Sequence, residues 1–246
     1  NEVNLYEKNE KLGKKIYITG KGRCNLTNAC DMEKLMDSVC TNRKFLYSAF
    51  YGYTNQDVID FFEKHGMKTK TERGDRVFPL SDKSADVIDT LRNTMKKAGV
   101  KVHLNTEVDT ILLTGEEDKK VTGIRLKDGT EVNADCILVA TGGFSYKSTG
   151  STGDGYRFAE EAGHKVTELS PSLVPFNTRE EYGKRMQGLS LKNVTLSVYD
   201  GKKCLYEDFG EMMFTHFGIT GPLVLTASTA VLKKLRQKEL QIRIDL

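Results

Sequence analysis

The most specific candidate site is a glycine-punctuated segment, residues 20–28, which reads Gly-Lys-Gly-Arg-Cys-Asn-Leu-Thr-Asn. Its two glycines allow the backbone to approach a ligand closely, and Arg23 adds a planar cationic group suited to phosphate. The combination favours a ligand-binding loop over a charged surface turn. It is not a P-loop, because the G-x-x-x-x-G-K-[ST] spacing is absent. The candidate cofactor contacts in this segment are Gly20, Gly22, Arg23, Cys24, Asn25 and Thr27.

Cys24 has two interpretations. It lies beside Arg23, where a thiolate would be favoured, so it could serve as a redox thiol. A small packing residue beneath a bound cofactor is the alternative, and we favour it.

An acidic residue follows the first apolar run of the chain. Residues 3–6 predict a short strand that ends at Glu7, and Lys8 follows; both are candidate cofactor contacts. In dinucleotide-binding folds an acidic side chain at the end of the second strand accepts hydrogen bonds from ribose hydroxyls. The alternative is an ordinary solvated glutamate beside Lys8, since no G-x-G-x-x-G turn is present. Because this strand lies so close to residue 1, we expect the sequence to begin one βα unit inside its domain.

Two further glycine-rich stretches follow predicted elements. The apolar run Cys136–Ala140 predicts a strand buried on both faces, and the residues after it mark a close backbone approach to a cofactor or a crossing strand. The loop 150–155 precedes a helix and could cradle an anion, although its aspartate suits a hydroxyl better than bare phosphate. The candidate contacts here are Thr141, Gly142, Gly143 and Asp154.

Hydrophobic periodicity places these loops between regular elements. Residues 29–53 are expected to be irregular, and prolines near residue 172 indicate a domain boundary. Helices are expected at 54–65, 84–98 and 156–162, and strands at 100–104, 106–113, 121–126, 131–134, 194–199, 203–207 and 242–246.

Composition is typical of a soluble globular protein, with 246 residues of which 38% are hydrophobic and 29% charged. The net charge of +3 gives little reason to expect a nucleic-acid or membrane partner. Five cysteines without a Cys-x-x-Cys pair predict a reducing compartment, the cytoplasm. The four histidines lack metal-ligand spacing, so no metal site is predicted.

Taken together, these motifs resemble a family of bacterial FAD-dependent oxidoreductases that includes aminoacetone oxidase-like proteins and relatives of a bile-acid enone reductase. The most specific match is the Gly-Arg-Cys-Asn-x-Thr-Asn block at 22–28. The other matching stretches, in order, are 6–8, 140–143, 148–155, 171–175 and 214–222.

The resemblance implies an α/β fold, a two-dinucleotide-binding (Rossmann-like) flavoprotein core with an inserted β-rich domain. Residues 1–172 would form the FAD-binding core without its N-terminal strand-turn-helix, and 173–246 an incomplete substrate domain. The resemblance also places Glu7 on the adenosine ribose and the backbone of Val108 on the adenine. It places Gly22, Arg23, Cys24, Asn25 and Thr27 along the flavin and its pyrophosphate. A fragment that lacks both ends of the family pattern is expected to bind FAD poorly alone.

The expected function is electron transfer from NADH or NADPH through FAD to a small organic acceptor, such as an activated carbon–carbon double bond, or to oxygen. No residue stands out as a general acid, so no catalytic residue is named. Two alternatives stay open: a nucleotide-binding regulatory protein without turnover, and an RNA-modifying flavoprotein. A small-molecule substrate is the expected partner, and the sequence indicates no oligomeric state.

Overall fold

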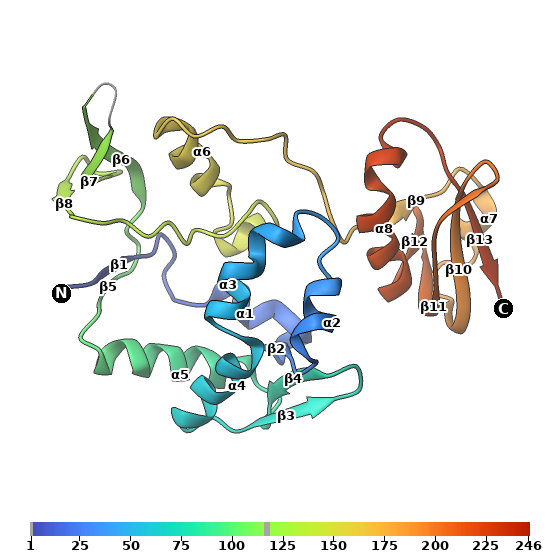
Figure 1. Ribbon diagram of the computed structural model, residues 1–246, viewed down its shortest axis with the longest axis horizontal. Coiled ribbons are helices and arrows are strands. Elements are labelled where there is room, and N and C mark those ends of the chain that lie inside the picture. The colour runs from blue at the N-terminus through green and yellow to red at the C-terminus, as the bar shows by residue number, and fades with distance from the viewer. Residues whose placement is uncertain (1, 116–118) are drawn as a thin grey trace. The chain divides into compact units, whose positions relative to one another are not determined.

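The computed structural model describes residues 2–115 and 119–246. It divides into two compact units, Asn1–Thr167 (unit 1) and Glu168–Leu246 (unit 2), which we describe separately (Figure 1). The division falls five residues before the expected boundary at residue 172. The assignment of the two parts to cofactor and substrate stays a prediction.

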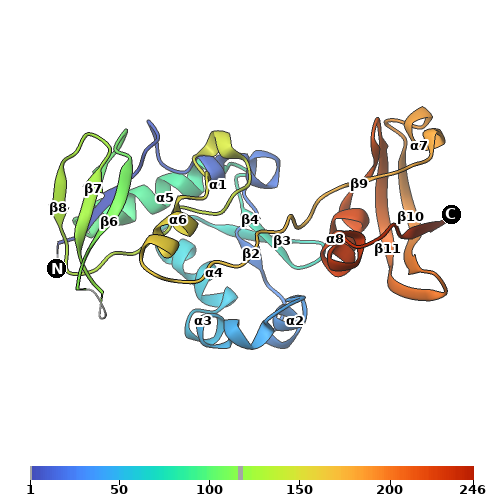
Figure 2. The same cartoon turned by 90° about the horizontal axis from the view of Figure 1, so that it is seen from above.

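Unit 1 combines helices with three small sheets. β1 and β5 form a parallel pair, β2-β4-β3 is antiparallel, and β6-β7-β8 is an antiparallel meander (Figure 2). Its helices are α1 (Lys14–Ile18), η1 (Thr19–Gly22), α2 (Met32–Asp37), η2 (Arg43–Leu46), α3 (Tyr47–Gly52), α4 (Asn55–Lys64), α5 (Ser84–Lys97), η3 (Lys147–Thr149) and α6 (Asp154–Glu161). Its strands are β1 (Asn4–Tyr6), β2 (Thr27–Asn28), β3 (Thr69–Glu72), β4 (Arg76–Pro79), β5 (Lys101–His103), β6 (Val108–Thr114), β7 (Lys120–Leu126) and β8 (Glu131–Asn133).

Local sequence explains the two main helices of unit 1. At α4, Thr54 and Asp57 form a reciprocal capping box that satisfies backbone N–H groups at the helix start. The apolar faces of α4 and α5 then meet in a small buried cluster that includes Phe62 and Val87. Cys24 belongs to this cluster, so the 20–28 segment is fixed against the helices rather than standing free.

Two sequence expectations in unit 1 are wrong. Residues 29–53 contain α2, η2 and α3 rather than irregular chain. The segment Cys136–Ala140 forms no strand, and Leu138 is 91% exposed. An apolar run becomes a buried strand only where neighbouring strands supply hydrogen-bond partners, and no described strand pairs with this segment.

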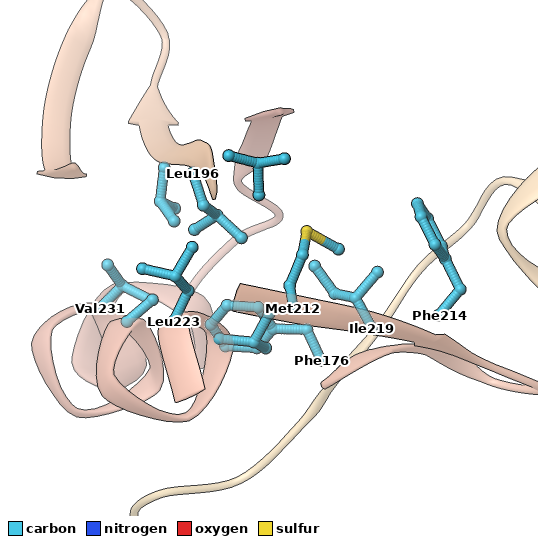
Figure 3. Close-up of a cluster of buried hydrophobic side chains, with 11 residues drawn as sticks. Phe176, Leu196, Met212, Phe214, Ile219, Leu223 and Val231 are labelled. Atoms are coloured by element: carbon cyan, nitrogen blue, oxygen red, sulfur yellow. The ribbon is translucent and has the colours of Figure 1, made fainter. Parts of the chain in front are cut away.

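Unit 2 is a five-stranded antiparallel sheet in the order β13-β10-β11-β12-β9. Helix α8 packs chiefly on β11, and its apolar face enters one buried cluster with the sheet (Figure 3). The sequence analysis did not predict α8, although Leu223, Ala227 and Val231 recur at helical spacing. The elements are β9 (Phe176–Asn177), α7 (Glu181–Arg185), β10 (Ser190–Asp200), β11 (Lys203–Thr215), β12 (Gly218–Thr220), α8 (Pro222–Leu235) and β13 (Gln241–Asp245).

Across the described residues, none of the helices combines the length and apolar character that crossing a membrane requires. The same residues contain no group of three or more His, Cys, Asp or Glu side chains arranged to hold a metal ion.

Candidate functional site

Glu7 is fixed at the end of the parallel pair of strands. Its backbone N–H donates to the carbonyl of His103 at 2.9 Å, and its carbonyl accepts from the N–H of Thr106 at 3.0 Å. The carboxylate oxygen Oε1 accepts from the backbone N–H of Asn9 at 2.9 Å and from its side-chain amide at 2.7 Å. Asn9 therefore holds the Glu7 carboxylate in one orientation at the strand end.

Lys8 and Asn9 join this strand end to the second glycine-rich loop. The Lys8 ammonium pairs with the Asp154 carboxylate at 2.6 Å and also donates to Thr152. The Asn9 amide donates to the carbonyl of Thr149 at 3.2 Å. Burial raises the pKa of Asp154, but hydrogen bonds from Lys8 and Thr152 outweigh it, so the net pKa lies below the ordinary value. Asp154 is thus held as a carboxylate that neutralises Lys8.

The Thr141–Gly143 stretch lies against the same loop. A Cβ built on Gly142 would lie 2.9 Å from the Ser151 hydroxyl oxygen, and one on Gly155 would lie 2.8 Å from the Thr141 hydroxyl oxygen. The two glycine-rich stretches therefore pack closely, with the Ser151 and Thr141 hydroxyls against glycine backbone. We call the resulting group the strand-end set; its members are Glu7, Lys8, Asn9, Thr141, Gly142, Gly143, Thr149, Ser151, Thr152 and Asp154.

The 20–28 segment forms a separate group against β4. Thr27 pairs with Val77 in the β2-β4 ladder. The side-chain amide of Asn25 faces the carbonyl oxygens of Thr27 at 3.0 Å and Val77 at 3.2 Å. Gly20 packs on Asn25, while the position of a Cβ on Gly22 has no neighbour within 4 Å among the described residues.

Arg23 contacts two carboxylates and an aromatic ring of the protein. Its Nη1 contacts the Glu72 carboxylate at 2.9 Å and the Asp82 carboxylate at 3.3 Å, and its guanidinium carbon lies 4.0 Å from the centre of the Phe78 ring. The hydrogen bond to Glu72 is the main cause that raises the pKa of Arg23. Because two carboxylates already face this cation, its arrangement fits a positioning role for the loop better than phosphate binding.

The ion pairs of Arg23 and Lys70 with Glu72 and Asp82 predict that the fold loses stability at acid pH. Hydrogen bonding to Arg23 lowers the pKa of Glu72 from its ordinary 4.5, and hydrogen bonding to Lys70 lowers that of Asp82 from 3.8. The stabilisation from these two carboxylates is therefore complete at a pH above their ordinary pKa values. It is lost as the pH falls through the lowered pKa values. We expect Arg23→Met to reduce the fall in Tm between about pH 6 and about pH 3. Arg185→Met, which removes an exposed arginine that forms no ion pair with a described carboxylate, should leave that fall unchanged.

Cys24 is buried, and burial raises the pKa of its thiol, against a smaller lowering by a hydrogen bond to Thr19. This favours the packing interpretation over a thiolate. We expect iodoacetamide at neutral pH to alkylate the exposed Cys136 and Cys204 and to leave Cys24 unmodified, as read by peptide mass mapping. Alkylation of Cys24 at the rate of Cys204 would instead support a redox thiol.

Val108 lies at the start of β6, two residues after Thr106, whose N–H donates to the carbonyl of Glu7. Helix α6 is tied to this strand because Arg157 donates to the carbonyl of Asp109, and Thr110 donates to Glu161 at 2.8 Å. Among the residues that the structure describes, no hydrogen bond or ion pair joins the 20–28 segment to the strand-end set. The contacting residues that the sequence analysis missed are Asn9, Glu72, Phe78, Asp82, Thr149, Ser151 and Thr152.

A comparison with sequence models of protein families shows to which family the chain belongs. The sequence model of the HI0933-like protein Rossmann domain matches residues 1–244. The chain belongs to this family. The match confirms the α/β, Rossmann-like fold class.

Three curated relatives of this HI0933-like chain cover nearly all of it. The 3-dehydro-bile acid delta(4,6)-reductase of Clostridium scindens is 31% identical over 99% of this chain and 58% of the relative, which confirms the resemblance. The ribosomal RNA dihydrouridine synthase of Haemophilus influenzae is 32% identical over 92% of the chain and 55% of the relative. That of Escherichia coli is 30% identical, over 92% and 54%. The chain thus spans little more than half the length of these relatives.

The strand-end set of the HI0933-like chain has the chemistry of a dinucleotide contact. Glu7 offers a carboxylate to ribose hydroxyls at a strand end, and the exposed Thr141 and Gly142 lie against the loop that Lys8 and Asn9 hold. The acidic residue of its loops 141–143 and 149–155 is Asp154, and Lys8 neutralises it, so these loops carry no uncompensated negative charge that would repel a phosphate. The strand-end set therefore fits a dinucleotide-type cofactor. Arg23 offers such a cofactor no free positive charge, because Glu72 and Asp82 already neutralise it.

Proposed function

We propose that the full-length HI0933-like protein is an FAD-dependent reductase that takes electrons from NADH or NADPH and reduces an activated carbon–carbon double bond in a small organic molecule. The observation that carries this proposal is the 31% identity to a bile-acid delta(4,6)-reductase along nearly the whole chain. The two dihydrouridine synthases bear names with the same chemistry, since dihydrouridine is uridine with one ring double bond reduced.

The residues of this chain would bind and orient the cofactor rather than react. Glu7, held by Asn9, would accept hydrogen bonds from the ribose, and the backbone of Thr141 and Gly142 would pass beside the cofactor. FAD supplies the hydride transfer when bound. The Lys8–Asp154 pair would keep the second loop against the strand end.

The test follows the visible absorbance of the full-length, FAD-loaded protein without oxygen. Addition of NADH or NADPH should bleach the flavin, and a steroid enone should restore the colour with formation of the saturated product. The saturated analogue, which has no double bond to reduce, is the matched control. Yellow absorbance that persists with both nicotinamides would favour the regulatory alternative. If the reduced flavin regains its colour when oxygen is admitted but not when the enone is added, oxygen is the acceptor.

Reduction of uridine in RNA is a second candidate, favoured by the 32% and 30% identities to the two ribosomal RNA dihydrouridine synthases. The same assay distinguishes it. A uridine-containing RNA should restore the colour of the reduced protein and gain dihydrouridine, whereas the steroid enone should not.

A further inference from the structure

Helix α3 and the η2 turn before it carry aromatic side chains that lie open to solvent. Neither element contains a buried residue, and Figure 2 shows α2 and α3 at one edge of unit 1. We call the exposed rings the aromatic face; its members are Phe45 (84% exposed), Tyr47 (43%), Tyr51 (58%) and Tyr53 (53%). A surface helix usually turns such side chains toward the core and polar ones toward water. A cluster of rings that faces water instead marks a contact surface.

The aromatic face is held in a defined geometry. The rings of Tyr47 and Tyr51, one helical turn apart, are stacked with their centroids 5.9 Å apart. The backbone N–H of Tyr53 donates to the carbonyl of Ala49 at 3.1 Å, which fixes the end of the helix. Because side chains that are already ordered lose little conformational freedom on binding, the face is prepared for a partner surface.

The composition of this face fits a protein partner better than a lipid surface. Residues 38–56 contain no acidic residue, and their basic residues are Arg43 and Lys44. Arg43 pairs with Asp37 at 2.5 Å, which leaves Lys44 as the cation of this stretch without an ion pair to a described carboxylate. Attachment to an anionic membrane relies on several lysines or arginines. The core of a protein interface, by contrast, is rich in Tyr and Phe and poor in charge.

The relatives of the chain indicate which protein segment covers the face. This chain matches 58%, 55% and 54% of the length of the three relatives described above, so a large part of each lies outside the match. A segment of the same chain is present at a high effective concentration and is not subject to the entropy cost of bringing two molecules together. Such a segment therefore occupies an apolar face in preference to a second copy of the protein.

The aromatic face also borders the most specific motif of the chain. Asn55, two residues after Tyr53, donates from its side-chain amide to the backbone carbonyls of Asn28 at 2.6 Å and Cys30 at 2.7 Å. Asn28 is the last residue of the 22–28 block. A segment that covers the face therefore lies beside this block.

We propose that the aromatic face is the docking surface for a segment of the full-length protein outside residues 1–246, which packs apolar side chains against Phe45 and Tyr51 beside the 22–28 block. The rings supply the apolar contact area, and the scarcity of charge lets water leave the contact without stranding an ion. The proposal goes beyond the proposed function and does not depend on electron transfer.

Nitration of tyrosine by tetranitromethane in the full-length, FAD-loaded protein tests the proposal, with the rate at each tyrosine measured by peptide mass mapping. A covered phenol reacts only when the docked segment opens, so Tyr51 should be nitrated at least about tenfold more slowly than N-acetyltyrosinamide. The rate should not change with protein concentration, because the contact lies within one chain.

Two substitutions at one position separate the contact from the fold. Phe45→Asp places a charge in the contact and should raise the nitration rate of Tyr51 about tenfold. Phe45→Leu, which keeps an apolar side chain, should leave Tyr51 slow. Phe209→Asp in unit 2 is the matched control, since it places the same charge at a ring that is 63% exposed, and it should also leave Tyr51 slow. Far-ultraviolet circular dichroism identifies any variant that fails to fold, and the rate in the unaltered protein tests the proposal without it.

Three results would overturn the proposal. Nitration of Tyr51 in the unaltered protein at the rate of N-acetyltyrosinamide would show that the face stays open. Protection that appears only as the protein concentration rises would assign the face to a second copy. Protection that appears only when phosphatidylglycerol vesicles are added would assign it to a membrane. A protein that protects Tyr51 as expected, but whose flavin neither NADH nor NADPH bleaches, would contradict only the reductase proposal.

Discussion

Leu196→Ala is expected to lower the free energy of unfolding of unit 2 by about 2–5 kcal/mol. Leu196 lies on β10, has 0% of its surface exposed, and points into the cluster that α8 closes, near Leu223 and Val231 (Figure 3). Truncation removes apolar contacts and leaves a cavity that the surrounding sheet and helix cannot fully close. Since a domain is stable by only about 5–15 kcal/mol, this loss is a large fraction of what holds unit 2 folded.

Urea unfolding of the chain, combined with hydrogen exchange on peptides from β10 and α8, measures this effect in the right unit. Phe209→Ala is the matched control, since it removes a larger side chain from β11 that is 63% exposed, and should cost within about 0.5 kcal/mol. Equal protection of α8 in the two variants would show that the helix is not held by the Leu196 cluster.

Elements whose signals are local agree best between sequence and structure. Helix α4 begins where Thr54 and Asp57 form their capping box, and α5 covers Ser84–Lys97 against an expected 84–98. The hairpin strands β6, β7 and β8 also lie within a few residues of their predicted bounds. These elements are specified by side chains a few positions apart, so the sequence contains the whole signal.

The sequence prediction was wrong for an element that depends on partners distant in the sequence. Cys136–Ala140 has the composition of a buried strand, but composition does not state whether another strand lies alongside it. Helix α8 was missed for a different reason. Its start, Gly221-Pro222, reads as a loop signal when Pro at the first helical position is overlooked. Its apolar spacing was visible, and a count against the helical period would have found it.

The candidate site shows the same division. Glu7, Lys8 and Asp154 come together because a strand end and a loop meet, as the order of motifs suggested. The role of Arg23 could not be predicted from the sequence, because its partners Glu72 and Asp82 are about 50 to 60 residues away and belong to no motif. An arginine beside glycines indicates an anion, and only the fold states whether that anion is a ligand or a carboxylate of the protein.

Gly142→Ala is expected to weaken FAD binding by the full-length protein about tenfold, or ~1.4 kcal/mol. Gly142 has φ +73°, a left-handed conformation that costs a residue with a side chain roughly 1–2 kcal/mol. Its new Cβ would also lie 2.9 Å from the Ser151 hydroxyl oxygen, so the two glycine-rich stretches must separate. Separation disturbs the loop that Lys8 and Asn9 hold beside Glu7, which is the part of the strand-end set proposed to face the ribose.

Titration of the apoprotein with FAD, followed by flavin fluorescence, measures the affinity. Gly163→Ala isolates the cause, because Gly163 has a similar φ of +92° but a Cβ there meets only the tip of Lys119, at 3.7 Å. Both variants lose comparable backbone stability, so a general weakening of the fold would lower FAD affinity in both. A loss confined to Gly142→Ala locates the cofactor at the strand-end set, while equal affinities in the two variants would place it elsewhere.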